Sequence, residues 1–246
     1  MQIIYEDNHI LAVTKTCHEI VQGDKTGDEP LPETLKRFIK ERDQKPGNVF
    51  LGVTHRLDRP TSGVVIFAKT SKALERLNRM FAEGEVHKTY WCIVENVWGR
   101  ESKGSRAALP PAEQDLTHYL VRNEKQNRSY AYDSREEALR HARPSDVKEA
   151  RLHYQVLSTT ERYALLGVRL YTGRHHQIRC QLSHIGLCIK GDLKYGAPRS
   201  NPDGGISLHS RQAQFVHPVS KQEVTLVAPV PDDTLWRVLS ETITVE

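Results

Sequence analysis

One carboxylate lies between two arginines in residues 54–63, which read Thr-His-Arg-Leu-Asp-Arg-Pro-Thr-Ser-Gly. Arg56 and Arg59 flank Asp58, and positive charges nearby favour the ionised form of a carboxylate. Pro60 stiffens the backbone and the closing glycine permits a tight approach, so we expect Asp58 on an ordered loop. A carboxylate held in this way could act as a nucleophile, whereas a plain surface ion pair is the alternative interpretation.

This ten-residue segment resembles the signature of the RluA-type RNA pseudouridine synthases, in which His-Arg-Leu-Asp followed by Thr-Ser-Gly carries the one essential aspartate. Four further stretches match the family in the same order and extend the resemblance over nearly the whole chain: residues 5–13, 88–90, 172–179 and 191–196. The sequence Arg-Pro-Thr-Ser-Gly at residues 59–63 is most similar to the motif of the subgroup that contains tRNA pseudouridine synthase C. The resemblance implies an isomerase that converts a uridine in RNA to pseudouridine.

That reaction breaks the N-glycosidic bond, rotates the uracil and rejoins it through carbon, with no change of redox state. It needs a carboxylate, a dry pocket and a hold on the freed base, so we expect no cofactor. Because a paired uridine cannot reach a buried carboxylate, the nucleotide must leave the stack, at a cost of about a few kcal/mol.

The resemblance also assigns residues around the reacting base. Tyr90 matches the tyrosine that packs on this base, and stacking of that kind contributes ~1–3 kcal/mol; an ordinary core aromatic is the alternative. Arg179 matches the arginine that pairs with the essential aspartate, and such a pair would orient Asp58. Ile178 would form an apolar wall of the pocket.

Three basic residues are predicted to bind the rest of the substrate. Arg56 resembles the arginine that fills the space left by the displaced nucleotide, while Arg174 and Lys194 are expected to contact phosphates. The net charge is only +4, but seven basic residues and two acidic ones lie in residues 169–211, and six and two in residues 56–79. If the fold brings these stretches together, the cleft between them would suit a phosphate backbone.

Some positions depart from the family pattern. Residues 15–18 read Lys-Thr-Cys-His where relatives usually have Lys-Pro-x-Gly, so the conformation of that loop is open. Lys190 stands where an aliphatic residue commonly precedes Gly-Asp, and Ser210 replaces an expected alanine. None of these departures touches Asp58.

Metal and redox chemistry are not expected. His175, His176 and His184 lie close in sequence, but they lack acidic or thiol partners at ligand spacing, so we predict no metal site. The four cysteines show no C-x-x-C spacing and are interpreted as reduced structural thiols. The chain has no membrane-length apolar run and no secretory start, so we predict a cytoplasmic protein.

The elements that must position these residues follow from the hydrophobic pattern. A run of apolar residues at 64–68 predicts a strand directly after Asp58, and a helix capped by Thr70 or Ser71 and ended by Gly84 should follow. A second helix should follow the turn at 172–174 and carry Ile178 inward. The remaining predicted strands lie at 3–5, 10–13, 88–94, 115–121, 129–132, 150–156, 166–170, 214–218 and 224–227, and further helices at 33–42, 135–141 and 235–239.

This order of elements predicts an α+β architecture. The resemblance narrows it to the pseudouridine synthase fold, a mixed, largely antiparallel sheet flanked by helices with a central active-site cleft. We expect residues 1–246 to form a single catalytic domain without a separate N-terminal RNA-binding module, with an irregular polar lobe at 99–149. The predicted partner is structured RNA, either tRNA or rRNA, and we expect a monomer with no protein partner.

Two other function classes are compatible with parts of this pattern. A non-catalytic RNA-binding protein could keep the same fold and basic surface, but binding alone does not require a carboxylate among phosphate-attracting residues. A carboxylate-dependent hydrolase would need a second acidic residue as its acid or base partner. No such residue adjoins Asp58, and Asp192 is the candidate that the other motifs offer.

Overall fold

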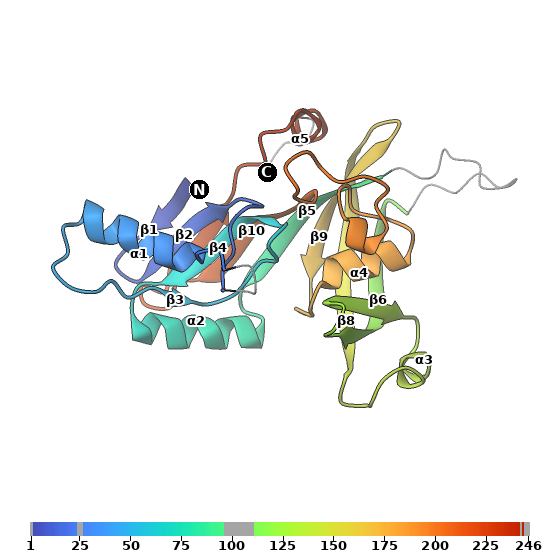
Figure 1. Ribbon diagram of the computed structural model, residues 1–246, viewed down its shortest axis with the longest axis horizontal. Coiled ribbons are helices and arrows are strands. Elements are labelled where there is room, and N and C mark those ends of the chain that lie inside the picture. The colour runs from blue at the N-terminus through green and yellow to red at the C-terminus, as the bar shows by residue number, and fades with distance from the viewer. Residues whose placement is uncertain (1, 24–26, 96–110, 242, 244–246) are drawn as a thin grey trace, which may run out of the picture. The chain divides into compact units, whose positions relative to one another are not determined.

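A computed structural model describes residues 2–23, 27–95, 111–241 and 243 of the chain (Figure 1). The chain divides into two compact units, each assembled from two separated segments. The first unit comprises residues 1–88 and 209–230, and the second comprises residues 89–208 and 231–246. Within the described residues, the search for a helix of membrane-spanning length and hydropathy finds none.

The first unit is built on a sheet in which the order is β1, β2, β4, β10 and β11, with the short β3 paired to one end of β4. Its strands are β1 (Gln2–Glu6), β2 (Ile10–Lys15), β3 (Gly52–Val53), β4 (Ser62–Ala68), β10 (Leu208–Val216) and β11 (Glu223–Val227). Neighbouring strands are antiparallel except that β4 runs parallel to β10. Because β2 and β4 are buried at nearly every position, both faces of this sheet are covered.

Two helices belong to the first unit. Helix α1 (Leu31–Arg42) begins after Pro30 and buries Leu35 and Ile39. Helix α2 (Ser71–Glu83) begins where the Thr70 hydroxyl accepts a hydrogen bond from the Ala73 amide, and it ends at Gly84, whose φ of 78° is left-handed. Its apolar face packs with β2, β4 and β10 in one core cluster, as the 3.6-residue pattern predicted.

Gly63 marks the point where β4 meets β10. Its φ of 115° is unfavourable for any residue with a side chain, and a Cβ atom there would collide with the backbone of Ser210, its register partner. Glycine is therefore required both for conformation and for strand contact. The strand that follows Asp58 starts at this close approach.

The second unit is an antiparallel sheet with the order β5, β9, β8, β6 and β7. Its strands are β5 (His87–Glu95), β6 (Glu113–Asn123), β7 (Arg128–Tyr132), β8 (Val147–Thr159) and β9 (Tyr163–Leu170). The helical segments are α3 (Arg135–Leu139), α4 (Gln177–His184), η1 (Leu193–Tyr195) and α5 (Thr234–Ser240). Helix α4 packs on β6 and β7, and the core beneath it contains Leu120, Ala150, Cys180 and Tyr195.

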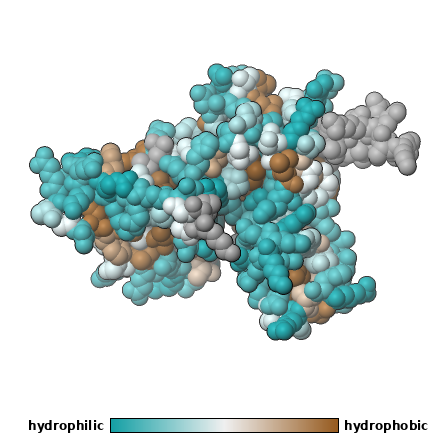
Figure 2. All heavy atoms as spheres, in the orientation of Figure 1, coloured by the Kyte–Doolittle hydropathy of each residue, from teal (hydrophilic) through white to brown (hydrophobic). Residues whose placement is uncertain are grey.

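The α+β architecture and its largely antiparallel pairing are confirmed. The predicted elements are present, most of them with boundaries shifted by a few residues, but β10 starts six residues before the strand predicted at 214–218, and the short β3 was not predicted. Of the lobe expected at 99–149, residues 99–110 lie outside the described residues. Residues 113–149 contain β6, β7 and α3, which match the strands predicted at 115–121 and 129–132 and the helix predicted at 135–141. Strand β6 pairs with β8 along residues 113–121 and with β7 along residues 119–123. Hydrophilic side chains predominate on the side of this region seen in Figure 2.

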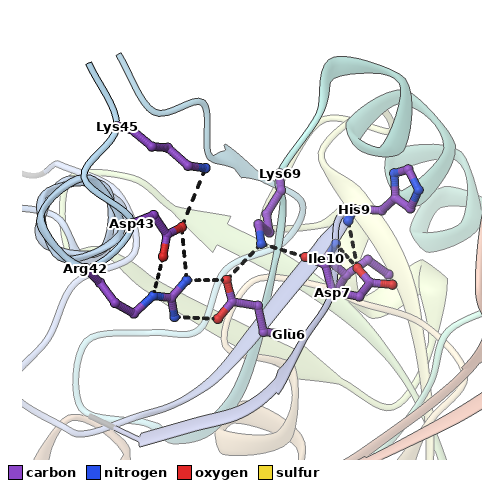
Figure 3. A network of polar contacts seen from close by, with 8 residues as sticks. All are labelled: Glu6, Asp7, His9, Ile10, Arg42, Asp43, Lys45 and Lys69. Carbon is purple, nitrogen blue, oxygen red and sulfur yellow. Dashed lines mark hydrogen bonds and ion pairs between the residues drawn. The ribbon is translucent and has the colours of Figure 1, made fainter. Parts of the chain in front are cut away.

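A network of charges joins β1 to α1 and to the segment after β4 (Figure 3). Glu6 accepts hydrogen bonds from both Nη groups of Arg42, at 2.7 and 2.8 Å, and from Lys69 Nζ at 2.8 Å. Arg42, followed by Lys69, lowers the pKa of Glu6 to about 2 against the opposing effect of burial. The Lys69 ammonium also donates to the backbone carbonyl of Asp7.

Candidate active site

Asp58 lies in the first unit on a four-residue turn just ahead of β4. The Thr61 amide donates to the Asp58 carbonyl at 3.0 Å and so closes the turn over Arg59 and Pro60. The side chain of Asp58 is partly exposed. The ordered loop that Pro60 predicted is therefore present.

A buried lysine holds this turn from the side of β2. Lys15 is fully buried, and its Nζ donates to the carbonyls of Thr61 at 2.7 Å, Arg59 at 2.8 Å and Asp58 at 3.3 Å. A fourth bond reaches Thr16 O at 2.8 Å. Burial lowers the pKa of Lys15 to about 8, which still leaves most of the ammonium charged at neutral pH.

The residues before Asp58 are fixed to the middle of β4. Thr54 Oγ1 donates to the Ile66 carbonyl at 2.6 Å, and the Ile66 amide donates to His55 Nε2 at 3.1 Å. The imidazole of His55 also packs on the ring of Phe81 in α2, with 4.6 Å between centroids. Burial lowers the pKa of His55 to about 3, so the ring is neutral and can accept this bond. Both sides of the Asp58 turn are thus fastened to the sheet.

The two arginines that flank Asp58 have other partners. Arg56 is exposed and donates to Gln22 Oε1 at 2.6 Å. Arg59 forms an ion pair with Asp28 at 2.6 Å. The order of the loop is therefore explained by Lys15 and His55, and stabilisation of the Asp58 charge by its sequence neighbours stays a prediction.

Arg179 lies in α4 of the second unit and forms a buried, two-pronged ion pair. Its Nε donates to Asp192 Oδ2 at 2.6 Å, and its Nη2 donates to Asp192 Oδ1 at 2.8 Å. The guanidinium also lies over the ring of Tyr195, 5.1 Å from its centroid. Asp192 therefore orients Arg179, and the pair of Arg179 with Asp58 that the resemblance implies stays a prediction.

The turn that leads into α4 is organised by Gln177. Its Oε1 accepts from Thr172 Oγ1 at 2.8 Å and from the Arg174 amide at 2.9 Å, while its Nε2 donates to Arg151 O at 3.0 Å. His176, just before the helix, adopts a left-handed φ of 53°. These contacts fix the start of the helix on which Ile178 and Arg179 lie, and Ile178 is buried.

The other predicted substrate residues of the second unit lie on separate elements. Tyr90 is in β5, opposite Val168 of β9, and is 6% exposed. Arg174 is exposed and donates from Nε to Glu149 O at 2.9 Å. Lys194 donates from Nζ to Asn127 O at 3.0 Å, in the turn between β6 and β7.

Several residues of the site were not predicted from the sequence. The spacing of residues along the sequence does not show that Lys15 reaches three residues of the Asp58 turn. Nor does it show that Asp192 binds Arg179. Tyr195 binds the Ser129 amide at 2.8 Å and His176 Nδ1 at 3.0 Å, contacts that join segments far apart in sequence. The four cysteines, all described, are free thiols as expected.

Comparison with known proteins identifies the family of this chain. The tRNA pseudouridine synthase C of Vibrio vulnificus is 32% identical over 251 residues, which cover 98% of this chain and 94% of that protein. The ribosomal large subunit pseudouridine synthase D of Xylella fastidiosa is 31% identical, over 95% of this chain and 67% of that protein.

A solved structure gives the same fold. Human RNA Pseudouridylate Synthase Domain Containing 4 superimposes with a TM-score of 0.71 at 24% identity, over 94% of this chain and 89% of that one, and confirms the predicted pseudouridine synthase fold. The model of the RNA pseudouridylate synthase family matches residues 9–184, a range that contains Asp58, Tyr90 and Arg179. The chain belongs to the RNA pseudouridylate synthase family.

Proposed function

We propose that this chain isomerises a specific uridine in structured tRNA or rRNA to pseudouridine, with Asp58 as the essential carboxylate and the target nucleotide flipped out of its stack. The observation that carries the proposal is the construction of the Asp58 turn. Lys15 binds three of its carbonyls, and His55 fastens the preceding residues to β4. A reacting group held this firmly contributes to catalysis by being already oriented.

The second unit supplies the residues that we assign to the base. Tyr90 would stack on the flipped uracil, Ile178 would form an apolar wall, and Arg179 would pair with Asp58. The bidentate bond to Asp192 supports this role of Arg179, because it holds the guanidinium in one orientation.

Phosphate binding is assigned to basic residues of both units. Arg56 would occupy the space of the displaced nucleotide, while Arg174 and Lys194 would contact the backbone. A hollow of about 680 Å³ beside the β6–β7 hairpin supports binding to RNA in the second unit. Basic and aromatic side chains outnumber acidic ones in its lining. The basic and aromatic residues are Arg122, Lys125, Arg143, Tyr130, Tyr132 and His141, and the acidic residues are Glu124 and Asp146.

The choice between tRNA and rRNA is tested by giving the purified protein each RNA separately. We expect one class of RNA to gain pseudouridine at a defined position, because a flipped base must fit one pocket in one structural context. Names of the similar proteins include both classes, so the two incubations are needed side by side.

Mapping pseudouridines in cellular RNA tests the activity itself. Deleting the gene should remove at least one site, which wild-type protein restores and Asp58→Asn does not. Asp43→Asn is the matched control, since Asp43 is a carboxylate of the first unit that binds Arg42 away from the turn. If no site disappears on deletion while the purified protein still binds RNA, the chain is a non-catalytic RNA-binding protein.

A further inference from the structure

Three side chains with metal-ligand chemistry meet in the second unit, on the side of α4 that faces the β6–β7 hairpin. His118 comes from β6, Asp133 follows β7, and His184 is the last residue of α4. One donor atom from each residue lies within 4.8 Å of the other two. These three residues are far apart in sequence and meet only in the folded chain. Of the three, His184 was noted from the sequence, but His118 and Asp133 were not.

The donor atoms lie close to one another around Asp133 Oδ1. His184 Nε2 lies 2.8 Å and His118 Nε2 lies 3.7 Å from the same atom, Asp133 Oδ1. The two imidazole rings are nearly perpendicular, with an interplanar angle of 77° and 4.9 Å between centroids. In a tetrahedral zinc site with bonds of about 2.0–2.1 Å, ligand atoms are about 3.4 Å apart. The present distances bracket that value.

The surroundings combine a fixed floor with an open rim. The side chain of His118 is 7% exposed, whereas that of Asp133 is 78% exposed, so an ion could enter from solvent. On the inner side, Gln181 Nε2 donates to His118 Nδ1 at 3.0 Å and to Ala150 O at 3.1 Å. His118 is therefore held by its Nδ1 atom with Nε2 directed to Asp133.

Gln181 holds His118 from the inner side. Its Nε2 donates to His118 Nδ1 at 3.0 Å and also lies near the carbonyls of Ala150 and Leu116, at 3.1 and 3.5 Å. A histidine that binds a metal through Nε2 carries its proton on Nδ1. Metal binding would therefore replace the bond from Gln181 Nε2 to His118 Nδ1.

We propose that His118, Asp133 and His184 bind one divalent transition-metal ion of the zinc class, with water in the remaining coordination position. Two imidazoles and one carboxylate suit zinc better than magnesium or calcium, which prefer oxygen ligands alone. The ion would join the last residue of α4 to the β6–β7 hairpin. Its binding would stabilise the helix on which Ile178 and Arg179 lie.

Titration of the metal-free full-length protein with zinc chloride, followed by calorimetry and by thermal unfolding, tests the site. Wild type should bind one zinc ion and unfold at a higher temperature with zinc. Asp133→Asn and His184→Gln should each weaken binding at least about tenfold, since even outer-shell changes at zinc sites cost that much. The rise in unfolding temperature should disappear with them.

Asp115→Asn is the matched control. Asp115 is a carboxylate of the same unit, 73% exposed and 3.2 Å from a histidine, His153, and its loss should leave zinc binding unchanged. Unfolding without zinc shows that each variant folds. The proposal is overturned if the wild type binds no zinc. It is also overturned if both ligand variants bind zinc with wild-type affinity, which is the result expected if zinc binds to the free thiols instead.

Discussion

The ammonium group of Lys15 is one of the groups that hold the Asp58 turn. Lys15 uses hydrogen bonds to carbonyls on both sides of the turn, and its burial would be unfavourable without those partners. The chain departs from the Lys-Pro-x-Gly pattern after this lysine, yet the lysine itself is retained and its contacts do not require the missing proline or glycine.

Replacing Lys15 by Met should lower the rate of pseudouridine formation about a hundredfold, because a misplacement of about 1 Å at a reacting group costs that much. Each carbonyl that stays buried without a hydrogen-bond donor would also lower the free energy of unfolding by about 1–3 kcal/mol. Lys69→Met is the control, since Lys69 binds Glu6 and Asp7 instead of the turn. Equal losses in the two variants, measured at saturating RNA, would show that Lys15 has no special part in catalysis.

Asp192 neutralises the charge of Arg179 inside the second unit. Both side chains are almost fully buried, at 1% exposure for Asp192 and 6% for Arg179, so removal of the carboxylate would deprive a buried guanidinium of this two-pronged ion pair. Asp192→Asn should lower the free energy of unfolding by about 3–5 kcal/mol. Denaturant unfolding of this variant beside Asp115→Asn, an exposed carboxylate, measures the difference. A change below about 1 kcal/mol would contradict the buried pair.

At the scale of elements, β4 depends on a neutral histidine. His55 accepts the Ile66 amide, and its pKa is lowered from 6.5 to about 3 by burial and then by the charge of Lys88. Between these values the unfolded chain binds a proton that the folded chain does not. Stability is therefore complete above pH 6.5 and falls as the pH drops toward 3.

Below pH 6, His55 should lower the free energy of unfolding by about 1 kcal/mol for each unit by which the pH falls. His209, whose pKa is lowered to about 4 by burial, should add to the slope in the same direction. His55→Gln removes the first contribution, so its unfolding free energy should depend less steeply on pH. Denaturant titrations at pH 7.5, 6 and 5 test this, and parallel pH profiles for the two proteins would refute it.

Sequence periodicity predicted the elements because their causes are local. Thr70 and Gly84 bound α2 at the predicted positions, since a cap and a left-handed glycine act within one turn. The contacts of Lys15 with Arg59 and of Arg179 with Asp192 join separate elements, and no local pattern encodes such distances. Asp58 was found from its motif, whereas the residues that fix its loop became evident only from the fold.

In the lobe at 99–149, the strands at 115–121 and 129–132 and the helix at 135–141 were predicted, whereas the pairing of the first strand with β8 was not. The composition of the lobe is polar, and polarity favours loops when the face of a strand that packs inward is short of apolar residues. In the fold, the alternating positions Leu116, His118 and Leu120 of β6 are buried, and a histidine occupies the middle of that face. Pairing with β8 on one side and β7 on the other made the segment regular.

At the scale of the whole molecule, binding to RNA should depend on salt. Arg122 and Arg143 line the hollow beside the β6–β7 hairpin, and each phosphate contact that is lost should reduce the salt slope of the binding constant by about 1. Replacing both by Ala should therefore weaken binding more at low salt than at high salt. Arg37→Ala is the control, because Arg37 lies on α1 and pairs with Glu29. Filter binding over a salt series would contradict the assignment if the slopes coincide.

Both units are assembled from separated segments, and the proposed residues are divided between them. Asp58 and Arg56 belong to the first unit, while Tyr90 and Arg179 belong to the second. Full-length protein is therefore the right material for every assay of the proposed activity.

The most direct test of the central claim is the formation of pseudouridine in bulk tRNA and rRNA by purified wild-type protein and by Asp58→Asn. The wild type should form about one pseudouridine per substrate molecule. The variant, which keeps the size of the side chain but not its charge, should form none above background while still binding RNA. Product formed by the variant at a rate near that of the wild type would show that Asp58 is not the reacting carboxylate.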